Sequence, residues 1–192
     1  VKFFLKKGFE VIGIDNNQRR EFFGKDGDTT TTKKQLLKFK KYKHFNIDIR
    51  KKNLIANIFK KYKKNIKSLF HFGEFARIYQ SFINMNECID SNTVGTNSVF
   101  NFCLKNKIRL IYSATSASLG NKGNDKNLSP YAFSKSKNLE LLENLKKLFN
   151  FKYEVIYFYN VYGQRQICEG DMATVIGIFE KQYKLGKPSK CS

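Results

Sequence analysis

The segment Leu110-Ile111-Tyr112-Ser113-Ala114-Thr115, followed after a short loop by Ser129-Pro130-Tyr131-Ala132-Phe133-Ser134-Lys135, decides how the rest of the chain is interpreted. Its first part is an apolar run that ends in hydroxyl residues, which is typical of a buried strand. Ser129 and Pro130 predict a helix start, because serine caps helix N-termini and proline loses no hydrogen bond at the first helical position. The sequence therefore predicts a strand, a loop and a helix in close succession.

Tyr131 and Lys135 lie four residues apart on the predicted helix, so their side chains share one face. An ammonium group beside a phenol favours the ionised form of the phenol. The pair therefore predicts a tyrosine whose pKa is lowered enough for it to act as a base. The same spacing also fits a core aromatic residue beside a solvated lysine, so other segments have to decide between the two interpretations.

The length and the net charge of the chain limit the classes of protein to which it can belong. The chain has 192 residues, enough for one domain with its own core, and 36 Lys and Arg against 16 Asp and Glu give a net charge of +20. The lysines are spread along the chain and concentrated between Lys33 and Lys67, without an RNA-recognition, helix-turn-helix or zinc-finger motif. We interpret the charge as a solvated surface that attracts anionic ligands, and we do not expect a nucleic acid partner.

The sequence contains no stretch apolar and long enough for a membrane span. Its four cysteines form no C-x-x-C pair, and its two histidines lie far apart without a cluster of ligands, so we expect no disulfide framework and no metal site. This cysteine usage favours the reducing environment of the cytoplasm.

Strand-like and helical segments alternate along the chain at the spacing of βαβ units. We expect strands at 9–15, 42–49, 68–73, 110–113 and 153–159. Helices are expected at 1–7, 53–64, 77–105, 130–149 and 172–185, with 16–41 as a loop that contains a short helical piece. The predicted fold class is α/β, a Rossmann-like doubly wound parallel sheet with helices on both faces.

Several segments resemble, in the same order, the extended short-chain dehydrogenase/reductase family in its NAD-dependent epimerase and dehydratase branch. Beside Thr115, Tyr131 and Lys135, the matching segments are Asp15, Asp48-Ile49, His71-Phe72-Gly73, Asn92-Thr93-Val94-Gly95-Thr96 and Asn160-Val161-Tyr162-Gly163-Gln164-Arg165. Three positions depart from the family pattern: Glu74 replaces a small residue, Leu119 a tyrosine and Gln164 a proline.

The resemblance implies a catalytic set of Thr115, Tyr131 and Lys135. Tyr131 would be the base, Thr115 would hydrogen-bond the reacting sugar oxygen, and Lys135 would hold the nicotinamide ribose and lower the tyrosine pKa. Ser116 takes the hydroxyl role if the register differs by one residue. The implied substrate contacts are Thr115, Ser116, Tyr131 and Asn160.

The cofactor implied by the resemblance is NAD. Asp15 would accept hydrogen bonds from the adenosine ribose and repel a 2′-phosphate, although an aspartate before Asn16-Asn17 also suits a turn, and Arg19 and Arg20 would suit a 2′-phosphate. The implied cofactor contacts are Asp15, Asn16, Asp48, Ile49, Phe72, Gly73, Asn92, Ser113, Tyr131, Lys135 and Phe158.

The residues after Thr115 favour one reaction within the family. Ser116-Ala117 stand where the nucleotide-sugar 4,6-dehydratases carry an Asp-Glu pair, so a 4-epimerase acting on a nucleotide-sugar, expected to be UDP-linked, is favoured. A dehydratase, a reductase or decarboxylase of the family, and an inactive cofactor- or RNA-binding relative remain as alternatives. The resemblance also implies a homodimer of the full-length protein.

The same resemblance predicts that the sequence opens and stops in mid-fold. A first strand with its Gly-rich pyrophosphate loop would precede Val1, and most of a smaller substrate domain would follow Pro188. We assign 1–165 to an incomplete NAD-binding domain and 166–192 to the start of the nucleotide-sugar-binding region. Without that strand, we expect a gap or an exposed edge in the sheet.

Overall fold

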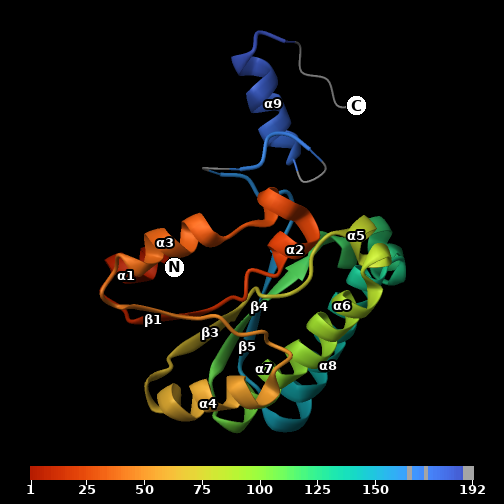
Figure 1. The fold of residues 1–192 in the computed structure, drawn as a ribbon. Helices are drawn as coiled ribbons and strands as arrows, with labels where there is room; N and C mark the ends of the chain where they lie inside the picture. Colours follow the sequence, from red (N-terminus) through yellow and green to blue (C-terminus); the bar gives the residue numbers. More distant parts are fainter. Residues whose placement is uncertain (164–165, 171–172, 188–192) are drawn as a thin grey trace.

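The computed structural model describes residues 1–163, 166–170 and 173–187 (Figure 1). Its strands are β1 (Val11–Ile14), β2 (Tyr42–Phe45), β3 (Ser68–His71), β4 (Arg109–Thr115) and β5 (Tyr153–Phe158). Its α-helices are α1 (Lys2–Lys6), α2 (Arg19–Phe23), α3 (Thr30–Leu37), α4 (Lys52–Tyr62), α5 (Ile78–Ile83), α6 (Met85–Ile89), α7 (Thr96–Lys105), α8 (Pro130–Phe149) and α9 (Val175–Lys184). The predicted α/β class is confirmed.

The strands pair in parallel but form two sheets. β1 pairs with β2, and β4 lies between β3 and β5. This break agrees with the gap or exposed edge expected in the sheet, because among the described residues no strand hydrogen-bonds to both β1 and β3. Contacts between side chains still join the two parts: the ring of Phe4 in α1 lies 5.2 Å from that of Phe70 in β3.

The main core surrounds β4, whose residues from Leu110 to Thr115 are all buried. α7 packs on β3 and β4, and α8 packs on β4, with Leu142 of α8 completely buried. α4 joins this layer through Phe59, whose ring stacks on that of Phe102 at 3.4 Å between centroids. β4 is therefore the strand whose ends are most firmly positioned.

The helix that follows β4 begins as the sequence predicts. The Ser129 hydroxyl accepts a hydrogen bond from the backbone N–H of Ala132 at 3.0 Å, and Pro130 is the first residue of α8. α8 ends at Phe149, and the residue after it, Asn150, adopts the left-handed conformation at φ 52°. Of its large apolar residues, Leu142 is buried, whereas Phe149 is 61% exposed.

Three other segments differ from their predicted form. The expected loop 16–41 contains α2 and α3, and β2 ends at Phe45, four residues before the predicted end. The single helical region 77–105 is divided into α5, α6, a π-helical turn (Asp90–Gly95) and α7. The divided region begins at Arg77, a non-glycine residue at φ 105°. α9 stands apart from the body of the fold (Figure 1).

Candidate active site

The carboxyl end of β4 borders a cavity of about 430 Å³. Its lining residues are Ile78, Thr115, Ser116, Ala117, Leu119 and Tyr159. The Thr115 hydroxyl also accepts a hydrogen bond from the N–H of Ala117 at 3.3 Å, which holds the chain as it leaves the strand. Ligands of open parallel sheets bind outside the carboxyl ends of the strands, so this cavity is the natural place for a substrate.

Tyr131 lies in the first turn of α8, where its side chain forms a hydrogen bond with that of Thr115. Burial raises the pKa of the Tyr131 phenol, the bond to Thr115 lowers it, and the Glu74 carboxylate raises it again. The net shift is upward. The lowered pKa expected from the Tyr131–Lys135 spacing is therefore wrong for the structure as it stands, because burial and a nearby carboxylate outweigh the effects that favour the phenolate.

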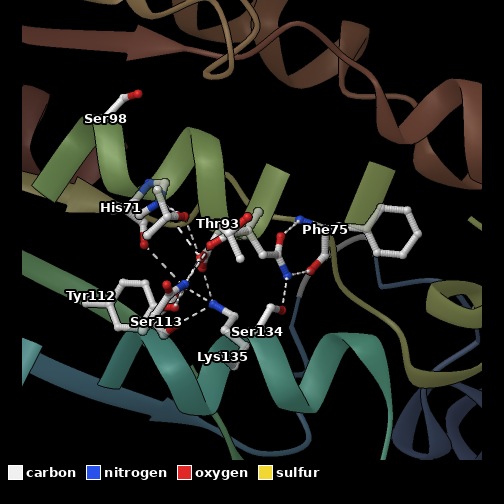
Figure 2. A network of polar contacts seen from close by, with 12 residues as sticks. His71, Phe75, Thr93, Ser98, Tyr112, Ser113, Ser134 and Lys135 are labelled. Carbon is white, nitrogen blue, oxygen red and sulfur yellow. Dashed lines mark hydrogen bonds and ion pairs between the residues drawn. The ribbon is translucent and has the colours of Figure 1, made fainter. Parts of the chain in front are cut away.

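Lys135 is 4% exposed, and its ammonium group is held inside the protein (Figure 2). It donates to the carboxylate of Glu74, to the carbonyl oxygen of Ser113 at 2.5 Å and to the Ser113 hydroxyl at 3.2 Å. It also lies 4.7 Å from the centre of the Tyr112 ring. An ammonium has three N–H donors, and these three bonds use all of them.

Glu74 is the residue of this site that sequence reasoning missed. Its side chain is 2% exposed, and besides Lys135 it accepts hydrogen bonds from Thr96 Oγ1 at 2.7 Å, Tyr112 Oη at 3.0 Å and Asn138 Nδ2 at 3.2 Å. The donors come from α7, β4 and α8. The only signal in the sequence was a carboxylate where the family pattern has a small residue.

His71 ends β3 beside this network and is 4% exposed. Its pKa is lowered to about 4, chiefly by burial, while the Glu74 carboxylate acts to raise it and the Lys135 charge to lower it. The imidazole is therefore neutral near pH 7. Its Nε2 lies 2.8 Å from Thr96 Oγ1, and because Thr96 donates to Glu74, we assign the ring proton to Nε2.

Asn92, in the π-helical turn, fixes the loop that carries Glu74. Its side-chain oxygen accepts from the N–H of Phe75 at 2.7 Å, and its Nδ2 donates to the Phe75 carbonyl and to Ser134 Oγ, both at 3.1 Å. Both ends of the amide are thus engaged within the protein. In the structure the Asn92 side chain hydrogen-bonds the backbone of the loop, and its direct contact with a cofactor stays a prediction.

Ser113, another expected cofactor contact, lies inside β4 and is 6% exposed. Its hydroxyl donates to the carbonyl oxygen of His71 at 3.1 Å and accepts from Lys135. The structure therefore brings Ser113, Lys135, Tyr131 and Thr115 together around the carboxyl half of β4.

The expected nicotinamide contacts lie at the ends of β3 and β5. The rings of Phe72 and Phe158 are 5.5 Å apart, and both are partly exposed. Gly73 faces open space, with no atom within 4 Å of where a Cβ would stand. These open aromatic and glycine positions leave room for the close approach of a flat cofactor ring, and the contact of Lys135 with a ribose stays a prediction.

The expected adenosine contacts are divided between two places. Asp15 and Asn16 line a second cavity, of about 460 Å³, where Asp15 also accepts the turn hydrogen bond from the N–H of Asn17 at 2.7 Å. Asp48 instead forms an ion pair with Arg50 at 2.6 Å, and Ile49 packs on Gly95. Burial acts to raise the Asp48 pKa, but the bonds from Arg50 bring it below its usual value.

The remaining expected contact, Asn160, is exposed in the loop after β5 and is not among the residues that line the first cavity. Gln164 and Arg165, which complete its motif, lie outside the described residues, as does the proposed domain boundary at 165/166.

Within the described ranges, three or more His, Cys, Asp or Glu residues do not gather where they could hold a metal ion. Nor does any described helix have the length and apolar character needed to cross a membrane.

Comparison with known proteins matches residues 1–191 to the NAD dependent epimerase/dehydratase family. The chain belongs to this family. A UDP-glucuronate 4-epimerase of Thermodesulfobacterium geofontis is 28% identical in an alignment 176 residues long that covers 84% of this chain and 51% of the relative. The match confirms the predicted membership of the NAD-dependent epimerase and dehydratase branch.

Solved structures of the family share the fold. The UDP-glucose 4-epimerase of Thermotoga maritima, crystallised with UDP-glucose, has a TM-score of 0.77 at 21% identity over 97% of this chain and 59% of its own. The UDP-glucose 4-epimerase of Thermus thermophilus in complex with NAD has a TM-score of 0.71 at 20% identity over 97% of this chain and 58% of its own. The chain thus spans between half and three-fifths of the length of these relatives.

Proposed function

We propose that this chain carries the catalytic centre of an NAD-dependent nucleotide-sugar 4-epimerase. One observation carries the proposal: the Tyr131 phenol and the Thr115 hydroxyl are hydrogen-bonded to each other where β4 opens into the 430 Å³ cavity. A base and a hydroxyl so arranged suit the removal of a proton from an alcohol that binds between them.

In this proposal, Tyr131 takes the proton from the hydroxyl at C4 of the sugar, and Thr115 donates to the same oxygen as its negative charge develops. NAD, when bound, supplies the acceptor for the hydride that leaves C4 and returns it to the other face of the ring. Ser116 lines the cavity beside Thr115 and would contact the sugar, with Asn160 approaching from the loop after β5. The upward-shifted pKa of Tyr131 leads us to expect faster turnover under alkaline conditions.

The cofactor would lie along the strand ends. Asp15 and Asn16 would hold its adenosine in the 460 Å³ cavity, while Phe72, Gly73 and Phe158 would border the nicotinamide. The net charge of +20 favours the approach of both anionic ligands, the dinucleotide and a UDP-sugar. A homodimer and a cytoplasmic location remain part of the proposal.

The dehydratase is the second candidate, since it shares the family and the same tyrosine. Water loss from the sugar needs an acid and a base beyond the tyrosine, and Ser116 and Ala117 provide no carboxylate at the cavity. Epimerisation needs no such pair. An inactive cofactor- or RNA-binding relative is disfavoured, because such a protein has no need for a phenol hydrogen-bonded to a hydroxyl at the end of β4.

Product analysis tests the choice between these reactions. The full-length protein that contains this chain is incubated with NAD and either UDP-glucose or UDP-N-acetylglucosamine, and the sugar products are separated and identified. Inversion at C4 supports the epimerase. A 4-keto-6-deoxy product establishes the dehydratase instead, and salt-sensitive RNA binding without turnover contradicts both enzymatic proposals.

A further inference from the structure

His44, in β2, carries a ring nitrogen that the described part of the chain leaves without a partner. Its Nε2 is buried and forms no hydrogen bond. The Asp15 carbonyl is close enough to affect the pKa of the ring, yet it does not meet the geometry of a hydrogen bond to Nε2. Buried polar atoms nearly always have a partner, so this one needs an explanation. His44 also lines the 460 Å³ cavity together with Asp15 and Asn16, and a ligand bound there is such a partner.

The other ring nitrogen of His44 is held by Tyr42, two residues earlier on the same face of β2. Tyr42 Oη lies 3.2 Å from His44 Nδ1, and the Tyr42 side chain is buried with Leu5 and Leu36. Gly13, which pairs with His44 across the two strands, makes room for the phenol, because a Cβ there would lie 2.2 Å from Tyr42 Oη. The phenol therefore engages Nδ1 and leaves Nε2 as the ring nitrogen available to a ligand.

The charge state of His44 limits which ligand group suits Nε2. Burial lowers the pKa of the imidazole, the nearby Lys33 lowers it as well, and the Asp15 carboxylate opposes the shift. The net change is downward from 6.5, so the ring is neutral near pH 7. The Tyr42 hydroxyl can donate to Nδ1 or accept from it, which makes Nε2 a donor in one tautomer and an acceptor in the other. A hydroxyl group of a ligand pairs with Nε2 in both tautomers.

The charged groups of the cavity bear on the same choice. Lys33 and Lys34, on α3, line it and favour an anionic group, whereas the Asp15 carboxylate repels one. A carboxylate accepts hydrogen bonds from hydroxyl groups, and Asp15 and His44 come from the ends of neighbouring parallel strands. A carboxylate and a neutral imidazole on one cavity suit the two adjacent hydroxyls of a ribose better than a phosphorylated ribose.

We propose that His44 is a cofactor-binding residue whose Nε2 pairs with a hydroxyl of the adenosine ribose of NAD, beside Asp15. His44 then makes the cavity selective for a ribose with free hydroxyls. The inference rests on the proposed function, which places the adenosine of NAD in this cavity. Its test measures binding without turnover, so its failure and that of the epimerase proposal are distinguishable.

The test is isothermal titration calorimetry of NAD with the full-length protein that contains this chain. His44→Phe keeps an aromatic ring and removes Nε2, so we expect the Kd for NAD to rise about tenfold. His44→Gln keeps a polar group that can reach the place of Nε2 and should retain most of the affinity. Thr32→Ala, at an exposed residue of α3 that does not line the cavity, is the control and should leave the Kd unchanged. His44→Ala, which leaves space for water at the Tyr42 hydroxyl, gives the same comparison if His44→Phe does not fold.

Analogues of NAD identify the group that His44 contacts. The loss caused by His44→Phe should disappear with one of the two analogues that lack the 2′- or the 3′-hydroxyl of the adenosine ribose, because the bond is then already absent. An unchanged Kd for NAD in His44→Phe, or an equal loss for NAD and both analogues, overturns the inference. Tighter binding of NADP than of NAD also overturns it, since Lys33 and Lys34 would then recognise a 2′-phosphate. If the unaltered protein binds no NAD, the proposed function fails and the inference fails with it.

Discussion

Replacement of Asn92 by leucine tests the hydrogen-bonded clamp on which the position of Glu74 depends. Leucine has a similar size but pairs with neither backbone group of Phe75, which Asn92 bonds at 2.7 and 3.1 Å. Asn92 is completely buried, so water does not replace the lost partners. Each unpaired buried group costs about 1–3 kcal/mol, and we therefore expect the free energy of unfolding to fall by about 3 kcal/mol.

Urea denaturation followed by circular dichroism measures this change. Asn101→Leu is the matched control, because Asn101 lies exposed on α7 and its replacement should alter the free energy of unfolding by less than about 0.5 kcal/mol. A loss below about 1 kcal/mol for Asn92→Leu would refute the argument, since it would mean that the loop satisfies its backbone groups without the asparagine.

Three further predictions concern packing, protonation and capping. A Cβ on Gly95 would stand 2.6 Å from Ile49 Cγ1, so Gly95→Ala should lower the free energy of unfolding by about 1–2 kcal/mol, whereas Gly73→Ala, facing open space, should be nearly neutral in the same urea measurement. The His71 pKa falls from 6.5 to about 4 on folding, so the neutral ring contributes stability that is complete above pH 6.5 and lost as the pH falls toward 4. The free energy of unfolding should fall by about 3 kcal/mol over this pH range, and the fall should be absent in His71→Gln. Equal pH dependence of the two proteins would contradict the prediction. Ser129→Ala removes the α8 cap and should cost about 1 kcal/mol in thermal or urea unfolding; an unchanged stability would show that the 3.0 Å bond to Ala132 is dispensable.

Local signals in the sequence were sufficient for the elements around the site. Ser129 and Pro130 specify the start of α8 through short-range chemistry, and the apolar run of β4 specifies a buried strand regardless of its partners. The bounds of α3, within the segment predicted as a loop with a short helical piece, were not predicted because its first turn consists of threonines, which have low intrinsic helix preference. Its formation therefore depends on packing such as that of the buried Leu36.

Long-range partners explain what the sequence did not reveal about the site. A glutamate after a strand is expected to be solvated, and the burial of Glu74 depends on Thr96, Tyr112, Asn138 and Lys135, which only the folded chain brings together. The predicted lowering of the Tyr131 pKa considered the helix alone and omitted this carboxylate. By contrast, local patterns predicted the parallel strands correctly, and the expected gap lies between the β1–β2 pair and the sheet of β3, β4 and β5.

The most direct test of the account is the turnover of Tyr131→Phe in the full-length protein, measured as C4 inversion of UDP-glucose in the presence of NAD. Tyr79→Phe, which alters a tyrosine 74% exposed on α5, is the matched control. If Tyr131 is the base at the cavity, its loss should reduce kcat at least about 100-fold, while the control retains the rate of the unaltered protein. Full activity of Tyr131→Phe would contradict the central claim and require another group to take the proton.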